Sequence, residues 1–229
     1  LDEEKIEQII QIQEKLHITY GRNRKRCAIG VYPLEKIKFP IKYKADEPEK
    51  IKFQPLEAAG EMTAAEILEN HKAGKEFAHL LEEKEKYPFF IDANDNILSM
   101  PPVINSHDTG RVTEETKSLF VECSGFDFDV LHKCLNMIVT ALSDMSGVIY
   151  SIELEYNDGK KVTPDLKPTK MKLDMDYLNK RLGLDLNELG AGKLLEKMGF
   201  GYEKGKILIP AYRTDILHQI DLAEDLAIA

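Results

Sequence analysis

The feature that most constrains the fold is a change in the order of predicted elements near residue 166. Before this point predicted strands alternate with amphipathic helices, and the longest helix, over residues 127–147, carries an apolar stripe at helical spacing. After it come two short helices, a tight hairpin and a terminal helical segment. The 229 residues are enough for two domains with separate cores. We therefore expect an α/β (α+β) mixed-sheet domain over residues 1–165 and a smaller module over 166–229.

Local signals place the elements of the first domain. Residues 1–16 have apolar side chains at helical spacing, and the segment TAAE at Thr63 has the pattern of a capping box. This box predicts a helix through about Asn70, followed by a second short helix that Gly74 interrupts. Residues 87–100 alternate about a polar turn, which indicates a hairpin.

Cap and turn residues define the smaller module. Asp174 and Asn187 are typical helix N-caps, and the two helices that they open are expected to stop at Gly183 and Gly199. The next strands turn at Lys204-Gly205. Two helices followed by a hairpin are the layout of a winged-helix-like module.

Composition excludes several classes of protein. The net charge of −9 gives no bulk attraction for nucleic acid, and the one basic cluster, GRNRKR, is either a solvated loop or a local RNA contact. No segment has the length and hydrophobicity of a membrane span. None of the three cysteines stands in a CxxC pair, so neither a disulfide framework nor a zinc site is predicted. A reducing, cytoplasmic setting is expected.

Five stretches, in order along most of the chain, together resemble the β subunit of phenylalanyl-tRNA synthetase of the archaeal and eukaryotic type. They are YGRNRKRCAIGVYPLEKI, HKAGKEFAHLL, PPVINSHDTGRVT, SLFVECSGFD and IPAYRTDILHQIDLAEDLAIA. The resemblance implies an editing domain, followed by a winged-helix-like module that precedes a catalytic-core-like domain. The last stretch stops in the middle of an apolar pattern, so we expect the chain to be a fragment.

The function that the resemblance implies is proofreading. The α subunit activates phenylalanine with ATP and charges phenylalanine tRNA, and the β subunit hydrolyses tRNA mischarged with tyrosine, in an enzyme of two α and two β chains. Neither an ATP site nor a phenylalanine pocket is identifiable in this chain. An alternative is a non-catalytic scaffold that docks the partner subunit and tRNA. A metal-dependent phosphatase or nuclease is a weaker third reading, because no phosphate loop accompanies the carboxylates.

The candidate editing residues follow from strand alternation and from the resemblance. Glu122 and Ser124 stand at alternate positions of one predicted strand, so their side chains share a face. The family often has Asp-x-Thr here, and Glu-x-Ser retains the chemistry with a different reach. By resemblance, Ser99 and Asn105 flank the Pro101-Pro102 pair and form a wall of the pocket. The alternatives are an edge-strand pair facing water and ordinary turn chemistry.

Two further residues are candidates for substrate binding. Phe90 would line the slot for the substrate ring, although a role in the core explains it equally well. His107 is the nearest imidazole, and the alternative is an idle side chain in a loop. Since the chain shows no Ser-His-Asp constellation, we expect a positioned water, helped by the ribose hydroxyl of the substrate, and no covalent intermediate.

The terminal segment carries four acids whose spacing suggests a metal site. Asp221, Glu224 and Asp225 share one helical face, and Asp215 is expected near the start of the helix. Hard carboxylate oxygens suit Mg²⁺, although a solvated acidic face is the alternative. The resemblance implies a magnesium site shared with the α subunit, with Asp225 where the family usually has Glu. We expect little or no ordered metal in this chain alone.

Overall fold

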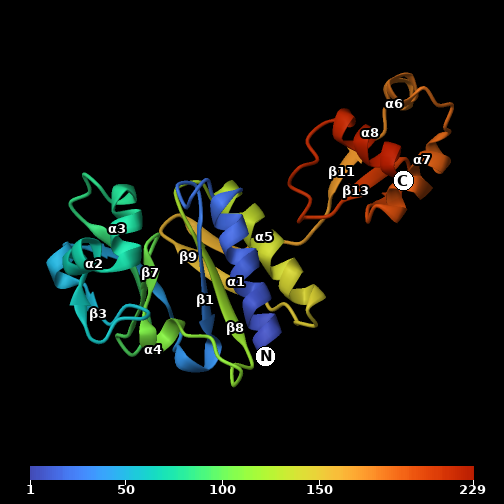
Figure 1. Ribbon diagram of the computed structural model, residues 1–229. Coiled ribbons are helices and arrows are strands. Elements are labelled where there is room, and N and C mark those ends of the chain that lie inside the picture. Colours follow the sequence, from blue (N-terminus) through green and yellow to red (C-terminus); the bar gives the residue numbers. More distant parts are fainter. The chain divides into compact units, whose positions relative to one another are not determined.

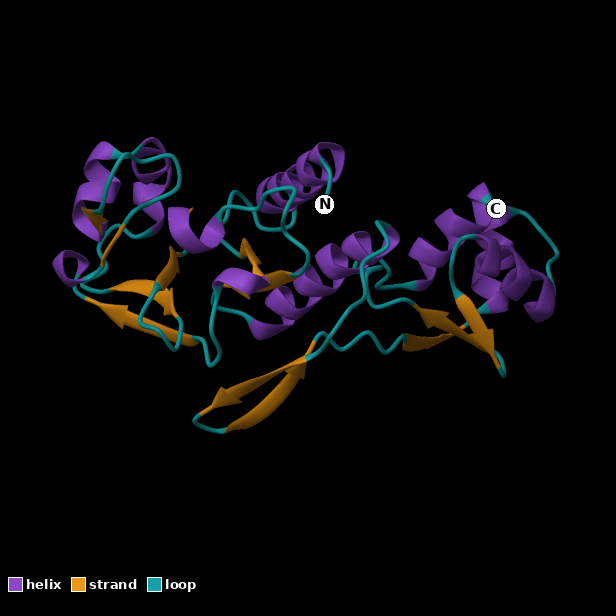
Figure 2. Cartoon of the chain, turned by 90° about the horizontal axis from the view of Figure 1, so that it is seen from below, coloured by secondary structure: helices purple, strands orange, loops and turns teal.

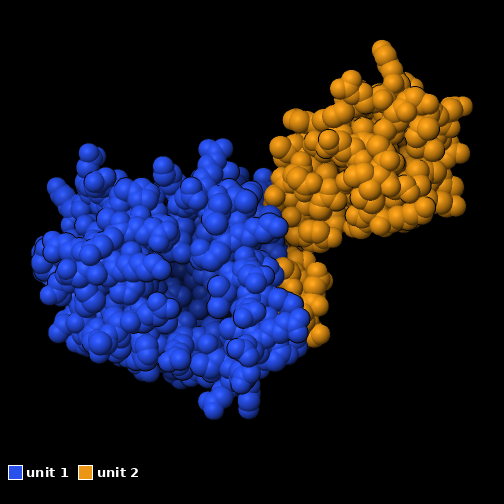
Figure 3. Space-filling view, viewed as in Figure 1, with its two compact units in different colours: residues 1–138 blue, residues 139–229 orange.

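The computed structural model describes residues 1–229, which form two compact units, residues 1–138 and 139–229 (Figure 3). The division falls within the long helix α5, Phe128–Asp144, which confirms the predicted helix over residues 127–147. Strands and helices intermix as the expected mixed α/β class requires. The predicted domain boundary near residue 166 stays a prediction, and each unit is described by itself below.

The first unit holds a pair of strands, a four-stranded sheet and a short third pair. All pairings are antiparallel: β1 with β8, β2-β5-β6-β7 in that order, and β3 with β4. The short strand β7 stands at an edge, as the preceding prolines predict. The strands are β1 (Ala28–Pro33), β2 (Lys42–Asp46), β3 (Lys52–Phe53), β4 (Met62–Thr63), β5 (Tyr87–Ile91), β6 (Ile97–Met100), β7 (Ile104–Asn105) and β8 (Leu119–Ser124).

Three helices of the first unit begin at residues whose side chains cap them. The helix α1 starts after Asp2, whose carboxylate accepts a hydrogen bond from the Lys5 backbone, and it packs against β1 (Figure 1). Thr63 and Glu66 form the predicted capping box of α2. The helices are α1 (Glu3–Ile18), α2 (Ala64–Asn70), α3 (Lys72–Phe77) and α4 (His107–Gly110). None of the helices in the structure combines the length and hydropathy that a bilayer span requires.

Gly74 has a different role from the predicted one. It lies inside α3 and does not interrupt it. A Cβ atom added there would lie 1.7 Å from the carbonyl oxygen of Ile67 in α2. The glycine therefore permits the close approach of two short helices, and the first of them ends at Asn70, before the extended backbone of His71.

Two apolar clusters of the first unit lie near the candidate site, a larger one around α2 and the four-stranded sheet and a smaller one around Tyr32. The larger core comprises Ile51, Phe53, Ala64, Ile67, Leu81, Phe89, Met100 and Val103. The smaller core comprises Tyr32, Ile37 and Leu98, with Ile41, Phe90 and Phe120 packed against it. The smaller core brings β1 onto the four-stranded sheet, and the candidate site lies there.

The second unit contains a hairpin of β9 and β10 and a three-stranded sheet, β11-β13-β12, covered by three helices (Figure 2). The strand β11 is absent from the prediction, because its four residues, TKMK, carry no apolar alternation. The elements are β9 (Ile152–Tyr156), β10 (Gly159–Thr163), β11 (Thr169–Lys172), α6 (Met175–Leu182), α7 (Glu188–Lys197), β12 (Gly201–Glu203), β13 (Lys206–Ile209) and α8 (Gln219–Ile228).

The predicted caps of this unit are confirmed. The side chains of Asp174 and Asn187 accept hydrogen bonds from the first turns of α6 and α7. Gly183 ends α6 in a left-handed conformation with φ of 68°. Lys204 and Gly205 both have positive φ in the turn between β12 and β13, as a tight hairpin requires.

Candidate functional site

A buried polar cluster forms around the hydroxyl group of Tyr32, a side chain with no exposed surface. The Tyr32 oxygen lies 2.7 Å from Ser99 Oγ, 3.3 Å from Glu122 Oε1 and 3.4 Å from Asn105 Oδ1. The structure thus brings three predicted site residues from three strands to one atom. Tyr32 itself is not among the predicted residues.

The pairing of β1 with β8 positions Glu122. Gly30 lies directly opposite Glu122, and Ala28 lies opposite Ser124. A Cβ atom at Gly30 would lie 2.5 Å from Glu122 Oε1 and 2.3 Å from the Tyr32 oxygen. The absence of a side chain at Gly30 therefore gives the carboxyl group its room. A glycine inside a predicted strand, with a tyrosine two residues later on the same face, is the signal that could have revealed both residues.

The four-stranded sheet supplies a row of side chains across its strands. Tyr43, Phe90, Ser99 and Asn105 are successive pairing partners on β2, β5, β6 and β7. Directly opposite residues of antiparallel strands project from the same face, so aromatic and polar groups share one row. The rings of Tyr43 and Phe90 are 4.6 Å apart. Phe90 thus lies next to Ser99 and packs against the smaller core, and its role in substrate binding stays a prediction.

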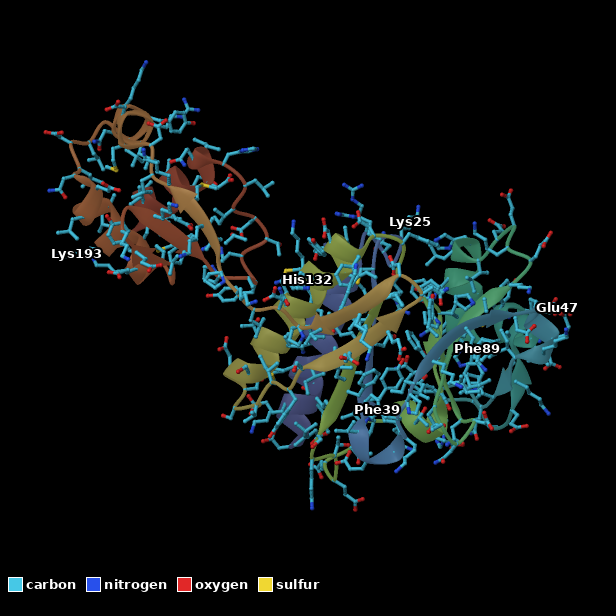
Figure 4. All side chains as sticks on the ribbon, turned by 180° about the vertical axis from the view of Figure 1, so that it is seen from behind. Lys25, Phe39, Glu47, Phe89, His132 and Lys193 are labelled. Atoms are coloured by element: carbon cyan, nitrogen blue, oxygen red, sulfur yellow. The ribbon has the colours of Figure 1, made fainter.

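Aromatic rings also enclose the other side of Tyr32. The Phe120 ring lies 5.9 Å from the Tyr32 ring, and Phe39, labelled in Figure 4, stands edge-on to Phe120 at 5.7 Å. Phe39 is partly exposed. The polar cluster is therefore bordered by an apolar layer that extends to the surface, which is the composition that binding sites for small organic groups generally have.

Burial controls the protonation of Glu122. This residue is 8% exposed, and burial raises the pKa of its carboxyl group to about 8, against opposing effects of the Tyr32 and Ser124 hydroxyl groups. Burial and the charge of Glu122 together raise the pKa of the half-exposed Tyr43 to about 12. At neutral pH Glu122 is therefore mainly a neutral acid that can donate a hydrogen bond.

Two oxygen atoms of the candidate site have no partner. Glu122 Oε2 and Ser124 Oγ are buried and make no hydrogen bond. Such atoms are rare in folded proteins because an unpaired buried polar group costs about 1–3 kcal/mol. Both belong to the predicted Glu-x-Ser pair.

His107 lies outside this cluster. Its Nδ1 atom is 3.2 Å from the neighbouring Asp108 carboxylate, and its side chain is about one-third exposed. No hydrogen bond in the structure joins His107 to Tyr32 or Glu122. Its role in substrate binding stays a prediction.

The basic cluster GRNRKR is not uniformly a solvated loop. Arg24 turns inward, donates to the carbonyl oxygens of Pro102 and Val103, and pairs with Glu14 at 3.1 Å. Its guanidinium group also covers the Phe77 ring at 4.0 Å. Arg24 therefore braces the loop between Ser99 and Asn105. This role depends on contacts with residues distant in sequence, so the charge pattern alone could not predict it.

The four acids of the terminal segment have separate partners. Arg213 donates to Asp215 at 2.8 Å and to the buried Asp225 at 2.7 Å. Asp221 accepts hydrogen bonds from two backbone N–H groups at the N-terminus of α8, while Glu224 is exposed. Asp215 was expected near the helix start but precedes the helix, because α8 begins only after the cap at His218.

These contacts also set the charges of the acids. Hydrogen bonds from Arg213 lower the pKa of Asp215, and backbone N–H groups lower the pKa of Asp221. A guanidinium group holds two of the four acids and a helix terminus holds a third, so these carboxylates do not form one magnesium ligand set in this chain. The magnesium ion shared with a partner subunit stays a prediction.

Comparisons with known proteins find similar sequences and a similar fold. The family model of the tRNA synthetase B5 domain matches residues 171–229. Phenylalanine–tRNA ligase β subunits of Thermococcus sibiricus and Pyrococcus horikoshii are each 45% identical over 233 residues. Those alignments cover 100% of this chain but 42% of each relative, so the chain spans less than half their length.

A solved structure extends this similarity to three dimensions. It is the crystal structure of an N-terminal fragment of the phenylalanyl-tRNA synthetase β subunit from Pyrococcus horikoshii. The superposition has a TM-score of 0.94 at 45% identity and covers 100% of this chain and 67% of that one.

Proposed function

Since the chain belongs to the family of phenylalanyl-tRNA synthetase β subunits, we propose that its first unit hydrolyses tyrosine wrongly esterified to phenylalanine tRNA. The observation that carries this proposal is the buried cluster of Tyr32, Ser99, Asn105 and Glu122, with unpaired oxygen atoms on Glu122 and Ser124. An ester-hydrolysing site that selects tyrosine needs hydrogen-bonding groups for a phenol beside apolar groups for the ring, and here the polar cluster lies beside the aromatic side chains of Phe90 and Phe120.

Physical selectivity explains why such a site is useful. A hydrophobic pocket for phenylalanine rejects an isostere with one added hydroxyl only weakly, by about a hundredfold. A second site that hydrogen-bonds the hydroxyl discriminates in the opposite direction, because a phenylalanyl ester would leave buried polar atoms unpaired. Glu122 Oε2 and Ser124 Oγ are atoms of this kind.

Tyr32 illustrates the chemistry that the cluster supports. Its own phenol oxygen lies within hydrogen-bond distance of Ser99 and Glu122. The first carboxyl oxygen of Glu122 is thus engaged by one phenol, while the second has no partner. We infer that this second oxygen and Ser124 bind the phenol of the substrate, with Phe90 beside its ring.

The protonation of Glu122 indicates that other groups activate the water. A carboxyl group whose pKa is about 8 is mainly protonated at neutral pH. Glu122 would therefore donate a hydrogen bond to the phenol of the substrate, and it is a poor general base. In the proposed mechanism Ser99 and Asn105 orient the water. The ribose hydroxyl next to the ester takes part in proton transfer.

Deacylation of tyrosyl-tRNA by the 229-residue chain tests the proposal. Glu122→Ala and Asn105→Ala are expected to lower the rate at least tenfold, whereas Glu155→Gln, a change at an exposed strand position, should leave it unchanged. The wild-type chain should leave phenylalanyl-tRNA intact. A rate that the Glu122 variant retains in full would refute the assignment.

The second unit supports a complementary role. Its match to the B5 domain of tRNA synthetases favours docking of a partner, and apolar side chains such as Leu189 and Leu217 are exposed on it. We propose that this unit contacts the α subunit and phenylalanine tRNA within a cytoplasmic α₂β₂ ligase. We expect the chain to co-migrate with the α subunit and Leu189→Asp to abolish this co-migration. Deacylation by the first unit should be unaltered in the variant. Unaltered co-migration would contradict the role of this surface.

A further inference from the structure

Three cysteines that are far apart in the sequence meet in the first unit. Cys27 directly precedes β1, Cys123 lies in β8, and Cys134 lies on α5, the helix on which Figure 4 labels His132. All three are free thiols, and their sulfur atoms lie within 4.8 Å of one another. The sequence has no CxxC motif and therefore predicted no metal site. Strand pairing and helix packing bring the three thiols together.

We propose that Cys27, Cys123 and Cys134 form a binding site for one thiophilic metal ion, of the class to which Cu⁺ and Zn²⁺ belong. Thiolate ligands select such ions over hard cations. With metal–sulfur bonds of about 2.3 Å, three sulfur atoms around one ion are about 4 Å apart. The observed separations are within 4.8 Å, so small side-chain rotations suffice to close the site.

Metal binding requires the thiolate form of each cysteine ligand. Binding of an ion to the three thiols would therefore release their protons.

The protein supplies three ligands and an entry path. Cys27 and Cys134 are fully buried, whereas Cys123 is partly exposed. The neighbouring His17 is not a free fourth ligand, because its Nε2 atom accepts a hydrogen bond from the Ile29 backbone and its Nδ1 atom pairs with Glu14. The ion would thus be three-coordinate, as Cu⁺ accepts, or would complete its coordination with an exogenous ligand, as Zn²⁺ requires.

The position of Cys123 links this site to the strand of the candidate editing site. It stands between Glu122 and Ser124 on β8, so its side chain projects from the opposite face. A bound ion would tie the start of β1, the strand β8 and the helix α5 together. Metal binding should therefore stabilise the first unit, and the ion would not contact the polar cluster.

Metal titration of the reduced, metal-free 229-residue chain tests the inference. Cu⁺ and Cd²⁺, the latter as a spectroscopic substitute for Zn²⁺, are added in separate experiments while the ultraviolet thiolate-to-metal band is recorded. We expect the band of at least one ion to saturate at one equivalent, together with a rise in Tm. Cys123→Ser, at the partly exposed position, should weaken binding at least tenfold, and His107→Asn should not.

A second measurement needs no variant. In the wild-type chain, one equivalent of the bound ion should slow the reaction of all three cysteines with a thiol reagent, and removal of the ion by a chelator should restore it. If neither Cu⁺ nor Cd²⁺ gives a band that saturates at one equivalent, the proposal is overturned. A band that Cys123→Ser leaves unchanged, or thiols that react at the same rate with and without the ion, would overturn it as well.

Discussion

Replacement of Glu122 by Gln should change how the stability of the first unit depends on pH. Burial raises the pKa of this carboxyl group from 4.5 to about 8 in the folded chain. Between these values the folded state binds the proton and the unfolded state has released it. The free energy of unfolding therefore decreases as pH rises through this window, and the contribution of Glu122 is constant below about pH 4.5 and above about pH 8.

The magnitude follows from the linkage relation. One proton bound only in the folded state changes stability by about 1.4 kcal/mol for each pH unit. Raising the pH from about 5.5 to about 7.5 should thus remove up to about 2.7 kcal/mol through Glu122. Gln at this position has the same shape and no proton to lose, so the variant should lack this decrease.

Urea denaturation at a series of pH values measures the effect, with Glu155→Gln as a control at an exposed position. The stability of Glu122→Gln relative to wild type should increase steadily through the window, while the control should follow wild type. A difference between Glu122→Gln and wild type that stays constant over these two pH units would refute the reasoning.

Four further substitutions test packing and ion pairs. Asp225→Asn should cost about 1.5–3 kcal/mol because it weakens a buried bond to Arg213, whereas Asp215→Asn, at a side chain 62% exposed, should cost less than about 1 kcal/mol; equal losses in urea denaturation would contradict this. Gly30→Ala should destabilise by about 1–3 kcal/mol, since its Cβ would lie 2.3 Å from a buried hydroxyl, and an unchanged midpoint would oppose it. Gly74→Ala should lower Tm despite the better helix propensity of alanine, and a rise would contradict the close approach of α3 to α2.

Local signals in the sequence predicted much of the fold. The caps at Thr63, Asp174 and Asn187 and the turn at Lys204-Gly205 depend on hydrogen bonds between residues close in sequence, and the structure confirms all four. Strand alternation likewise placed Glu122 beside Ser124. These features are predictable because period and capping act within one element.

The features that sequence reasoning missed are contacts between distant elements. Tyr32 meets Ser99 across 67 positions of sequence, and Arg24 reaches the Pro102 carbonyl across 78. Arg213 bridges Asp215 and Asp225, because its guanidinium group donates to both carboxylates. Periodicity indicates which face a side chain occupies, but only tertiary packing determines which distant residue it meets.

Ligand discrimination by the first unit tests the proposed proofreading function most directly. Chemical-shift titration of the 229-residue chain with non-hydrolysable tyrosyl-adenosine and phenylalanyl-adenosine amides compares wild type with Glu122→Ala. We predict preferential binding of the tyrosyl compound, with shifts at Ser124, Asn105 and Phe90, and loss of this preference in the variant. Equal binding of the two compounds by wild type, or a tyrosine preference that survives in Glu122→Ala, would contradict the account.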